Sequence, residues 1–257
     1  MRAQQVLDAG TSIWLDDLSR AKISGADSHS LPSRIATSGV VGVTTNPSIF
    51  SAAISGAAEY SADIAQMAGS SVDDVVKKLT TDDVRQACDL FTQLYTTTHG
   101  VDGRVSIEVD PRLAHDTQGT IAAGKELWEI IDRPNVMIKV PATIEGLPAI
   151  TELIAAGISV NVTLIFSVKR YGQVIDAYMQ GIARCENPSA VHSVASFFIS
   201  RIDSSIDSLL KANGSPEAVS FLGKAAIANA HLAYQLFEDK FSSSTWEALA
   251  AKGANKQ

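Results

Sequence analysis

The chain has 257 residues, of which 46% are hydrophobic, and carries a formal net charge of -7. This length is sufficient for one large domain with a substantial core, so we expect a single domain over residues 1–257. The excess of acidic residues, without a basic run to offset it, argues against a nucleic-acid partner or an anionic membrane surface.

The sequence shows neither a targeting signal nor a membrane-spanning segment. Residues 1–14 lack the apolar core of a signal peptide, and no apolar stretch approaches the roughly 18 residues of a membrane span. We therefore expect a cytoplasmic protein. Cys88 and Cys185 lie far apart without a CxxC pairing, and the five histidines lack metal-ligand spacing, so no disulfide framework and no metal site is expected.

Six short runs rich in β-branched residues alternate with longer helical stretches, which is typical of a parallel sheet with crossover helices. The expected strands are residues 12–16, 41–46, 104–110, 136–140, 159–166 and 193–200. The clearest helices are expected at 117–131, 167–184 and 216–241. Residues 47–103 are longer than a usual crossover and are expected to form a helical insertion of two or three helices between strands 2 and 3, with Ser71 and Thr81 as N-caps.

Each expected strand has one aliphatic face and one face that carries polar side chains. In the third run the aliphatic face consists of Val105, Ile107 and Val109, opposite Ser106, Glu108 and Asp110. The fifth run repeats the pattern, with Val160, Val162 and Leu164 opposite Ser159, Asn161 and Thr163. This alternation predicts a (β/α)8 TIM-type barrel with polar groups turned inward. A flavodoxin-like or Rossmann sheet is the alternative, although it would bury those polar groups beneath a helix.

Lys139 is the leading candidate for chemistry, because it is a lysine within the apolar strand 136–140. Lysines are almost never fully buried unless they are paired or functional. An apolar wall that desolvates the ammonium favours the neutral amine that a Schiff-base nucleophile requires. The structural alternative is a lysine that reaches from the strand end to water.

Carboxylates and amides flank this lysine on other strands. Alternation places Asp16 and Glu108 on the same inner face, where one could move a substrate proton and the other position a water molecule, although each could be only an ion-pair partner. Asp17 has the opposite parity and is expected to be a helix cap or a surface acid. Asn46 lies within a Thr-Thr-Asn-Pro-Ser segment, residues 44–48, that could bind substrate hydroxyls or simply start a helix.

Two further segments could likewise bind a substrate or have only a structural role. Asn161 and Thr163 lie two residues apart on one strand face and could surround a sugar-like ligand or form a buried hydrogen-bonded pair. Arg201, just past the sixth strand, could bind a phosphate with two hydrogen bonds or pair with Asp203.

Several of these segments together resemble the transaldolases. The matching motifs are GVTTNPS at 42–48, SIEVD at 106–110 and MIKVP at 137–141. Residues 157–167 and 195–201 resemble the fifth and sixth strands of the family, and the opening WLDDLSR resembles its longer actinobacterial branch. The similarity extends from about residue 10 to the end of the chain.

The resemblance implies an enzyme of the pentose phosphate pathway that needs no cofactor. Such an enzyme transfers a dihydroxyacetone unit from sedoheptulose 7-phosphate or fructose 6-phosphate to glyceraldehyde 3-phosphate or erythrose 4-phosphate. The partners are then small sugar phosphates, with no nucleic acid and no membrane, and a homodimer is compatible with this picture.

The resemblance also implies roles for individual residues. Lys139 matches the Schiff-base lysine, Asp16 the acid/base for cleavage of the C3–C4 bond, and Glu108 the carboxylate that organises a catalytic water, which Thr163 would share. The remaining matches are substrate-binding residues: Asn46, Asn161 and Ser196 for the dihydroxyacetone hydroxyls, Phe198 as a lining residue, and Arg201 for a phosphate.

The number of strands expected in this sequence is smaller than in that family. Only about six of the eight β/α units are found in the 257 residues, whereas such relatives continue and supply two more strands and another phosphate-binding arginine. An open barrel would expose long sheet edges, so we expect a C-terminally incomplete part of a longer protein. Two alternative functions stay open: a fructose 6-phosphate aldolase, which shares the lysine, and an inactive barrel fragment with a binding or structural role.

Overall fold

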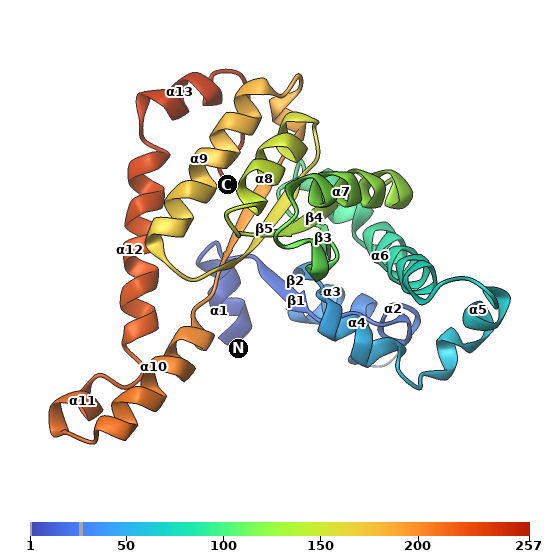
Figure 1. Cartoon of the computed structure of the whole chain (residues 1–257), viewed down its shortest axis with the longest axis horizontal. Helices are drawn as coiled ribbons and strands as arrows, with labels where there is room; N and C mark the ends of the chain where they lie inside the picture. The colour runs from blue at the N-terminus through green and yellow to red at the C-terminus, as the bar shows by residue number, and fades with distance from the viewer. Residues whose placement is uncertain (1, 26–27) are drawn as a thin grey trace. The chain divides into compact units, whose positions relative to one another are not determined.

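The computed structural model describes residues 2–25 and 28–257 (Figure 1). The chain divides into two compact units. The first unit contains the described residues up to 113 together with 122–139, and the second contains 114–121 and 140–257. The single domain expected from the sequence stays a prediction.

All six expected strands are confirmed, with ends that shift by up to three residues. The strands are β1 Ile13–Asp16, β2 Val40–Thr44, β3 Arg104–Glu108, β4 Val136–Pro141, β5 Val160–Ile165 and β6 Ser193–Phe197. In the first unit, β1 to β4 pair in parallel in the order of the chain. In the second unit, β5 pairs in parallel with β6. A doubly wound sheet reverses its strand order near the middle, so the sequential order agrees with the TIM-type barrel, of which six of the eight strands lie in the described residues.

Helices separate the strands in both units. The first unit contains α1 Arg2–Asp8, α2 Arg20–Ser24, α3 Leu31–Ser38, α4 Pro47–Ile54, α5 Ser61–Gln66 and α6 Val72–Thr97. Helix α7, Thr117–Ile131, has the expected bounds and runs from one unit into the other. The second unit contains α8 Gly146–Ala155, α9 Val168–Arg184, α10 Ser200–Asn213, α11 Pro216–Ser220, α12 Ala225–Lys240 and α13 Ser244–Ala250. Single 3-10 turns form at η1 Ala58–Tyr60, η2 Pro111–Leu113 and η3 Pro188–Ala190.

Two expectations about the helices are wrong. The helix expected over 216–241 is interrupted, because α11 and α12 are joined by a turn in which Gly223 adopts a φ of +71°. Thr81 is not an N-cap but lies buried inside α6, where its hydroxyl donates to the carbonyl of Lys77. Ser71 is confirmed as the N-cap of α6, since its hydroxyl accepts from the backbone N–H of Asp74.

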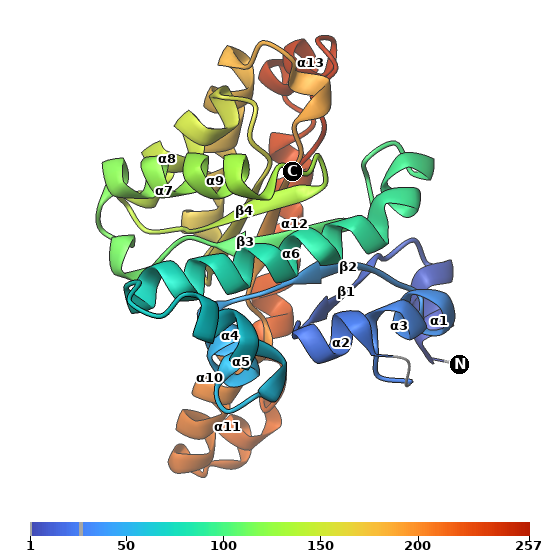
Figure 2. The same cartoon turned by 90° about the vertical axis from the view of Figure 1, so that its right-hand side faces the viewer.

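Helix α6 packs on β2 and β3 within the first unit and lies alongside both strands in Figure 2. Its buried face is made of small and large apolar side chains, together with two threonines and Asp83: Leu79, Thr80, Thr81, Asp83, Val84, Ala87, Cys88 and Phe91. This helix packs on the strand that ends at Glu108, so the packing helps to fix the position of that residue.

In the second unit, α8 and α9 lie side by side and both pack on β5 (Figure 1). Gly181 in α9 allows this close approach, since a Cβ at this position would lie 2.7 Å from the carbonyl oxygen of Thr151 in α8. In the part of the chain that the structure describes, every helix is too short or too polar to cross a membrane.

Candidate active site

Lys139 is buried beside a carboxylate. Residues Glu108 of β3 and Lys139 of β4 are paired in the sheet register, and Lys139 Nζ lies 3.6 Å from Glu108 Oε2. The side chain of Lys139 is 7% exposed and that of Glu108 is 10% exposed. Nζ also donates to the carbonyl oxygen of Thr45 at 3.1 Å. The alternative in which this lysine extends to water is therefore wrong.

Burial raises the pKa of the Glu108 carboxyl, because desolvation disfavours its charged form. The nearby positive charge of Lys139 acts in the opposite direction but does not cancel the effect. A carboxyl with a raised pKa next to a lysine can exchange protons closer to neutral pH than an ordinary glutamate. The pair is thus suited to proton transfer.

The segment after β2 connects two neighbouring strands and starts a helix. Thr45 is buried, and its hydroxyl donates to the carbonyl oxygen of Ser106 in β3 at 2.7 Å. Asn46 lies beyond the end of β2 and is the N-cap of α4, where its Oδ1 accepts from the backbone N–H of Ile49 at 3.0 Å. The helix-start interpretation of Asn46 is therefore confirmed. Its Nδ2 group is the one that could donate to a substrate hydroxyl.

Asp16 is the last residue of β1 and is exposed, and it is paired in register with Thr44 of β2. Thr44 has a buried hydroxyl without a hydrogen-bond partner among the described residues. Asp17 forms an ion pair with Lys22, which confirms the expectation of a surface acid. Asp16 and Asn46 thus lie at the carboxyl ends of adjacent strands, where TIM-type barrels carry their active sites.

In the second unit, Asn161 and Thr163 are both 1% exposed on β5. The hydroxyl of Ser196 on β6 donates to Asn161 Oδ1 at 2.8 Å, so two of the expected substrate-binding residues are in direct contact. The alternation of inward and outward side chains along β5 fails at Leu164, which is 40% exposed and has a φ of +60°. The register between β5 and β6 shifts at this point. The expected place of Leu164 beside Val160 and Val162 is therefore wrong. A bulge of this kind re-aims side chains near strand ends.

Phe198 follows β6, and Arg201 lies in the first turn of α10. The Arg201 guanidinium carbon lies 4.8 Å from the centre of the Phe198 ring. Asp203, the alternative partner of Arg201, instead accepts from the backbone N–H of Ala226 at 2.9 Å. Arg201 is exposed at a helix N-terminus, an arrangement suited to an anion.

The structure thus brings Lys139 together with Glu108 in the first unit, and Asn161 with Ser196 and Phe198 with Arg201 in the second. The carbonyl of Thr45 as the hydrogen-bond partner of Lys139 was not foreseen from the sequence. The two consecutive threonines at the end of β2 were visible in the sequence, but only the fold shows which of their atoms face the lysine. Among the described residues, no group of three His, Cys, Asp or Glu side chains could bind a metal ion.

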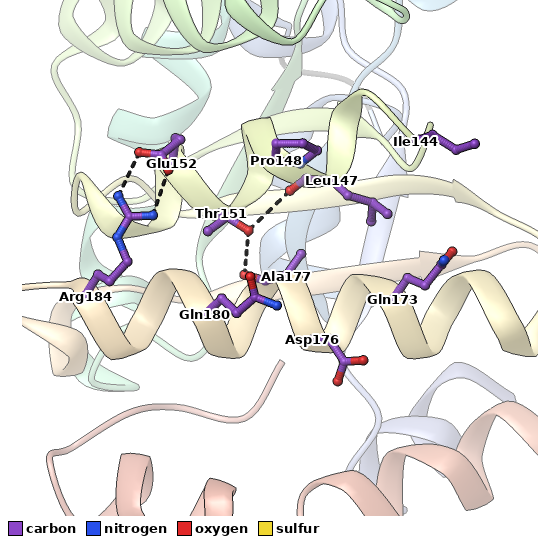
Figure 3. Close-up of a pocket in the computed structure, with 10 residues that line it drawn as sticks. All are labelled: Ile144, Leu147, Pro148, Thr151, Glu152, Gln173, Asp176, Ala177, Gln180 and Arg184. Carbon is purple, nitrogen blue, oxygen red and sulfur yellow. Dashed lines mark hydrogen bonds and ion pairs between the residues drawn. The ribbon is translucent and has the colours of Figure 1, made fainter.

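A separate cavity of about 510 Å³ is lined by residues on and just before α8 and on α9 in the second unit (Figure 3). Its charged lining residues are already paired, since Arg184 forms two hydrogen bonds with Glu152, at 2.7 and 2.9 Å, and Asp176 accepts from Lys240. The expected site residues do not line it. We therefore place the candidate chemistry at the strand ends and not in this cavity.

Parallel strands in chain order, alternating with helices, together with a buried lysine beside a buried carboxylate, define an enzyme of the (β/α)-barrel class. A sequence model described as Transaldolase/Fructose-6-phosphate aldolase matches residues 13–255. The chain belongs to this family.

Curated relatives narrow the activity within the family. Transaldolase 1 of Streptomyces avermitilis is 55% identical over 99% of this chain and 68% of its own length. The transaldolase of Mycolicibacterium smegmatis is 54% identical over 97% of this chain and 68% of its own length. The transaldolase of Thermobifida fusca is 50% identical over 99% of this chain and 70% of its own length. The activity is accordingly that of a transaldolase, a transferase, and neither the aldolase nor the inactive fragment is favoured.

Proposed function

We propose that the protein transfers a dihydroxyacetone unit between sugar phosphates through a Schiff base on Lys139. The donor is sedoheptulose 7-phosphate or fructose 6-phosphate, and the acceptor is glyceraldehyde 3-phosphate or erythrose 4-phosphate. The burial of Lys139 at 3.6 Å from Glu108 is the observation that carries this proposal. A buried amine beside a proton acceptor is the arrangement that activates a lysine for attack on a carbonyl.

The proposed reaction begins when neutral Lys139 attacks the C2 carbonyl of the donor. The carbonyl oxygen leaves as water, and an iminium forms on Nζ. Asp16 then takes the proton of the C4 hydroxyl, the C3–C4 bond breaks, and its electron pair moves into the iminium to give an enamine. The shortened aldose phosphate departs, and the enamine attacks the acceptor aldehyde. Water, organised by Glu108 and Thr163, finally hydrolyses the new Schiff base.

The other expected residues act in binding under this proposal. Asn46, Asn161 and Ser196 hydrogen-bond the dihydroxyacetone hydroxyls, and Phe198 lines the site. The contact between Ser196 and Asn161 supports a shared role for these two side chains. Arg201 binds a substrate phosphate, which its exposure at the start of α10 supports.

Borohydride trapping tests the nucleophile. Reduction in the presence of fructose 6-phosphate should add mass to the peptide that contains Lys139, because borohydride converts the iminium into a stable secondary amine. Lys139→Met should give no adduct and no transfer, while its unfolding temperature stays close to that of the unaltered protein. An adduct of undiminished yield in Lys139→Met would refute the assignment of the nucleophile.

An acceptor-dependence assay separates transfer from simple aldol cleavage. In a coupled assay with fructose 6-phosphate, product formation should depend on erythrose 4-phosphate, because the enamine must wait for an acceptor. Turnover without any acceptor, with free dihydroxyacetone as product, would indicate a fructose 6-phosphate aldolase. A cytoplasmic location and a homodimer also stay proposals, and cell fractionation and light scattering would test them.

A further inference from the structure

The segment that leaves β1 is short and is fixed at both ends. Asp17, Leu18 and Ser19 are the residues between Asp16, where β1 ends, and Arg20, where α2 begins. On one side, β1 pairs with β2 through Asp16 and Thr44. Within the segment, Leu18 is 0% exposed. The position of Asp16 therefore depends on what fixes Arg20.

Arg20 is fixed by two side chains from the insertion between β2 and β3. The backbone N–H of Arg20 donates to Tyr60 Oη at 2.9 Å. The Tyr60 hydroxyl in turn donates to Asp83 Oδ2 at 2.6 Å, and Arg20 Nε donates to Asp83 Oδ1 at 3.1 Å. The three residues form a closed ring of hydrogen bonds that includes a backbone group of Arg20.

Further contacts restrain the Arg20 side chain. The guanidinium carbon lies 4.5 Å from the centre of the Tyr60 ring. One terminal nitrogen donates to the carbonyl oxygen of Glu59 at 3.1 Å and forms an ion pair with Asp63. A planar guanidinium group that makes several hydrogen bonds is fixed in orientation as well as in position.

The ring is buried, although burial of a carboxylate is unfavourable. Asp83 is 0% exposed and Tyr60 is 1% exposed. Burial raises the pKa of the Asp83 carboxyl, while the hydrogen bond from Tyr60 and the charge of Arg20 lower it. Packed apolar residues of similar size would often stabilise a fold equally well, so a buried polar ring of this kind favours a specific geometry over bulk stability.

We propose that Tyr60 and Asp83 are positioning residues that set Asp16 for the proton transfer that breaks the C3–C4 bond. They act through the backbone of Arg20 and the three-residue segment Asp17 to Ser19, in which Leu18 is fully buried. The long helical insertion thereby serves the reaction and not only the packing of the barrel. This inference rests on the role proposed above for Asp16.

The composition of the trapped adduct tests this inference. With fructose 6-phosphate, borohydride traps the intact six-carbon donor on Lys139 before cleavage and the three-carbon unit after cleavage. Asp16→Asn, the reference variant, should shift the adduct toward six carbons. Tyr60→Phe and Asp83→Asn should shift it in the same direction, lower kcat about tenfold and leave KM nearly unchanged, because a misplaced base slows cleavage without weakening binding.

A matched control separates positioning from loss of stability. Tyr178 is also fully buried, and its hydroxyl donates to the carbonyl of Asn255 in the second unit. Tyr178→Phe should also lower the unfolding temperature, because it removes a buried hydroxyl that donates a hydrogen bond, and should leave the adduct composition unchanged. If Asp83→Asn does not fold, Arg20→Lys, which loses the Nε contact but keeps the backbone N–H, replaces it.

The outcomes test the catalytic role of Asp16 and the positioning role of Tyr60 and Asp83 separately. If Asp16→Asn gives the three-carbon adduct at the yield of the unaltered protein, the role proposed for Asp16 is wrong. If Asp16→Asn accumulates the six-carbon adduct and Tyr60→Phe does not, the positioning role of Tyr60 and Asp83 is wrong. A uniform fall in total adduct without a change in composition would also overturn the inference, since it would indicate a purely structural role.

Discussion

Lys139 Nζ and Glu108 Oε2 lie 3.6 Å apart on adjacent parallel strands, with little solvent access to either group. Burial raises the pKa of the Glu108 carboxyl, and the charge of Lys139 opposes that rise. The lysine and the carboxyl are therefore close enough for each to act on the electrostatics of the other. The strand register fixes this relationship, because Glu108 and Lys139 are direct partners in the sheet.

Glu108→Gln should lower kcat about 100-fold and remove the acid limb of the pH profile. In the unaltered protein this limb should lie above the ordinary range of a glutamate, because burial raises the pKa of Glu108. Activity is then lost as the pH falls through the raised pKa and the carboxyl becomes protonated. The measurement is kcat from pH 4 to 9 for both proteins, and an unchanged acid limb in the variant would exclude Glu108 as its source.

The same pKa shift predicts how stability depends on pH. A carboxyl whose pKa is higher in the folded state favours folding below its unfolded pKa, and this contribution is lost as the pH rises through the folded pKa. Urea unfolding at several pH values should show this dependence in the unaltered protein. Glu108→Gln should show a weaker dependence, because the buried Asp83 carboxyl, whose pKa burial also raises, is still present.

Asn46→Asp and Asn46→Ala should separate helix capping from substrate binding. Aspartate retains the oxygen that accepts from the Ile49 N–H, so Asn46→Asp should unfold at the same urea concentration as the unaltered protein. Asn46→Ala should lose about 1 kcal/mol, the usual value of an N-cap. Both variants lack the amide donor and should show a raised KM for the donor sugar. A normal KM in Asn46→Asp would exclude the amide from binding.

Thr45→Val should destabilise the fold and lower the reactivity of Lys139, whereas Thr45→Ser should do neither. Valine has nearly the shape of threonine but cannot donate to the carbonyl oxygen of Ser106, which leaves a buried acceptor with one partner fewer. The expected loss is about 1 to 2 kcal/mol of unfolding free energy. Because the Thr45 carbonyl accepts from Lys139 Nζ, the rate of borohydride trapping should also fall in Thr45→Val. Equal trapping rates in the two variants would argue against this link.

Gly42→Ala should destabilise the first unit, because an added Cβ would lie 2.6 Å from the Trp14 ring. The large fused ring of the half-buried Trp14 would have to shift to make room, so the expected cost is about 1 to 3 kcal/mol. Gly172→Ala in α9 is the matched control, since its Cβ would meet only Leu236 at an ordinary 3.5 Å. That variant should gain up to about 1 kcal/mol from helix propensity. Thermal unfolding of both proteins would show whether the signs are opposite.

Local sequence patterns were sufficient to predict the strands of this protein and the order in which strands and helices follow one another. β-Branched runs between helical stretches predicted all six strands, and alternation along them placed Asp16 and Glu108 on one inner face. These features depend on residues close together in the chain. Three predictions were wrong: Thr81 lies inside α6, a turn in which Gly223 has a positive φ interrupts the expected helix over 216–241, and Leu164 leaves the alternation where the strand register shifts.

The sequence by itself determined the strand-and-helix order and the identity of the candidate lysine, because propensity and periodicity are local properties of the chain. Only the tertiary structure decided which groups meet. The 3.6 Å approach of Lys139 to Glu108 depends on the register between two strands, and the ring of Arg20, Tyr60 and Asp83 joins residues from three separate elements. Such contacts arise from packing between distant segments, which no local pattern encodes.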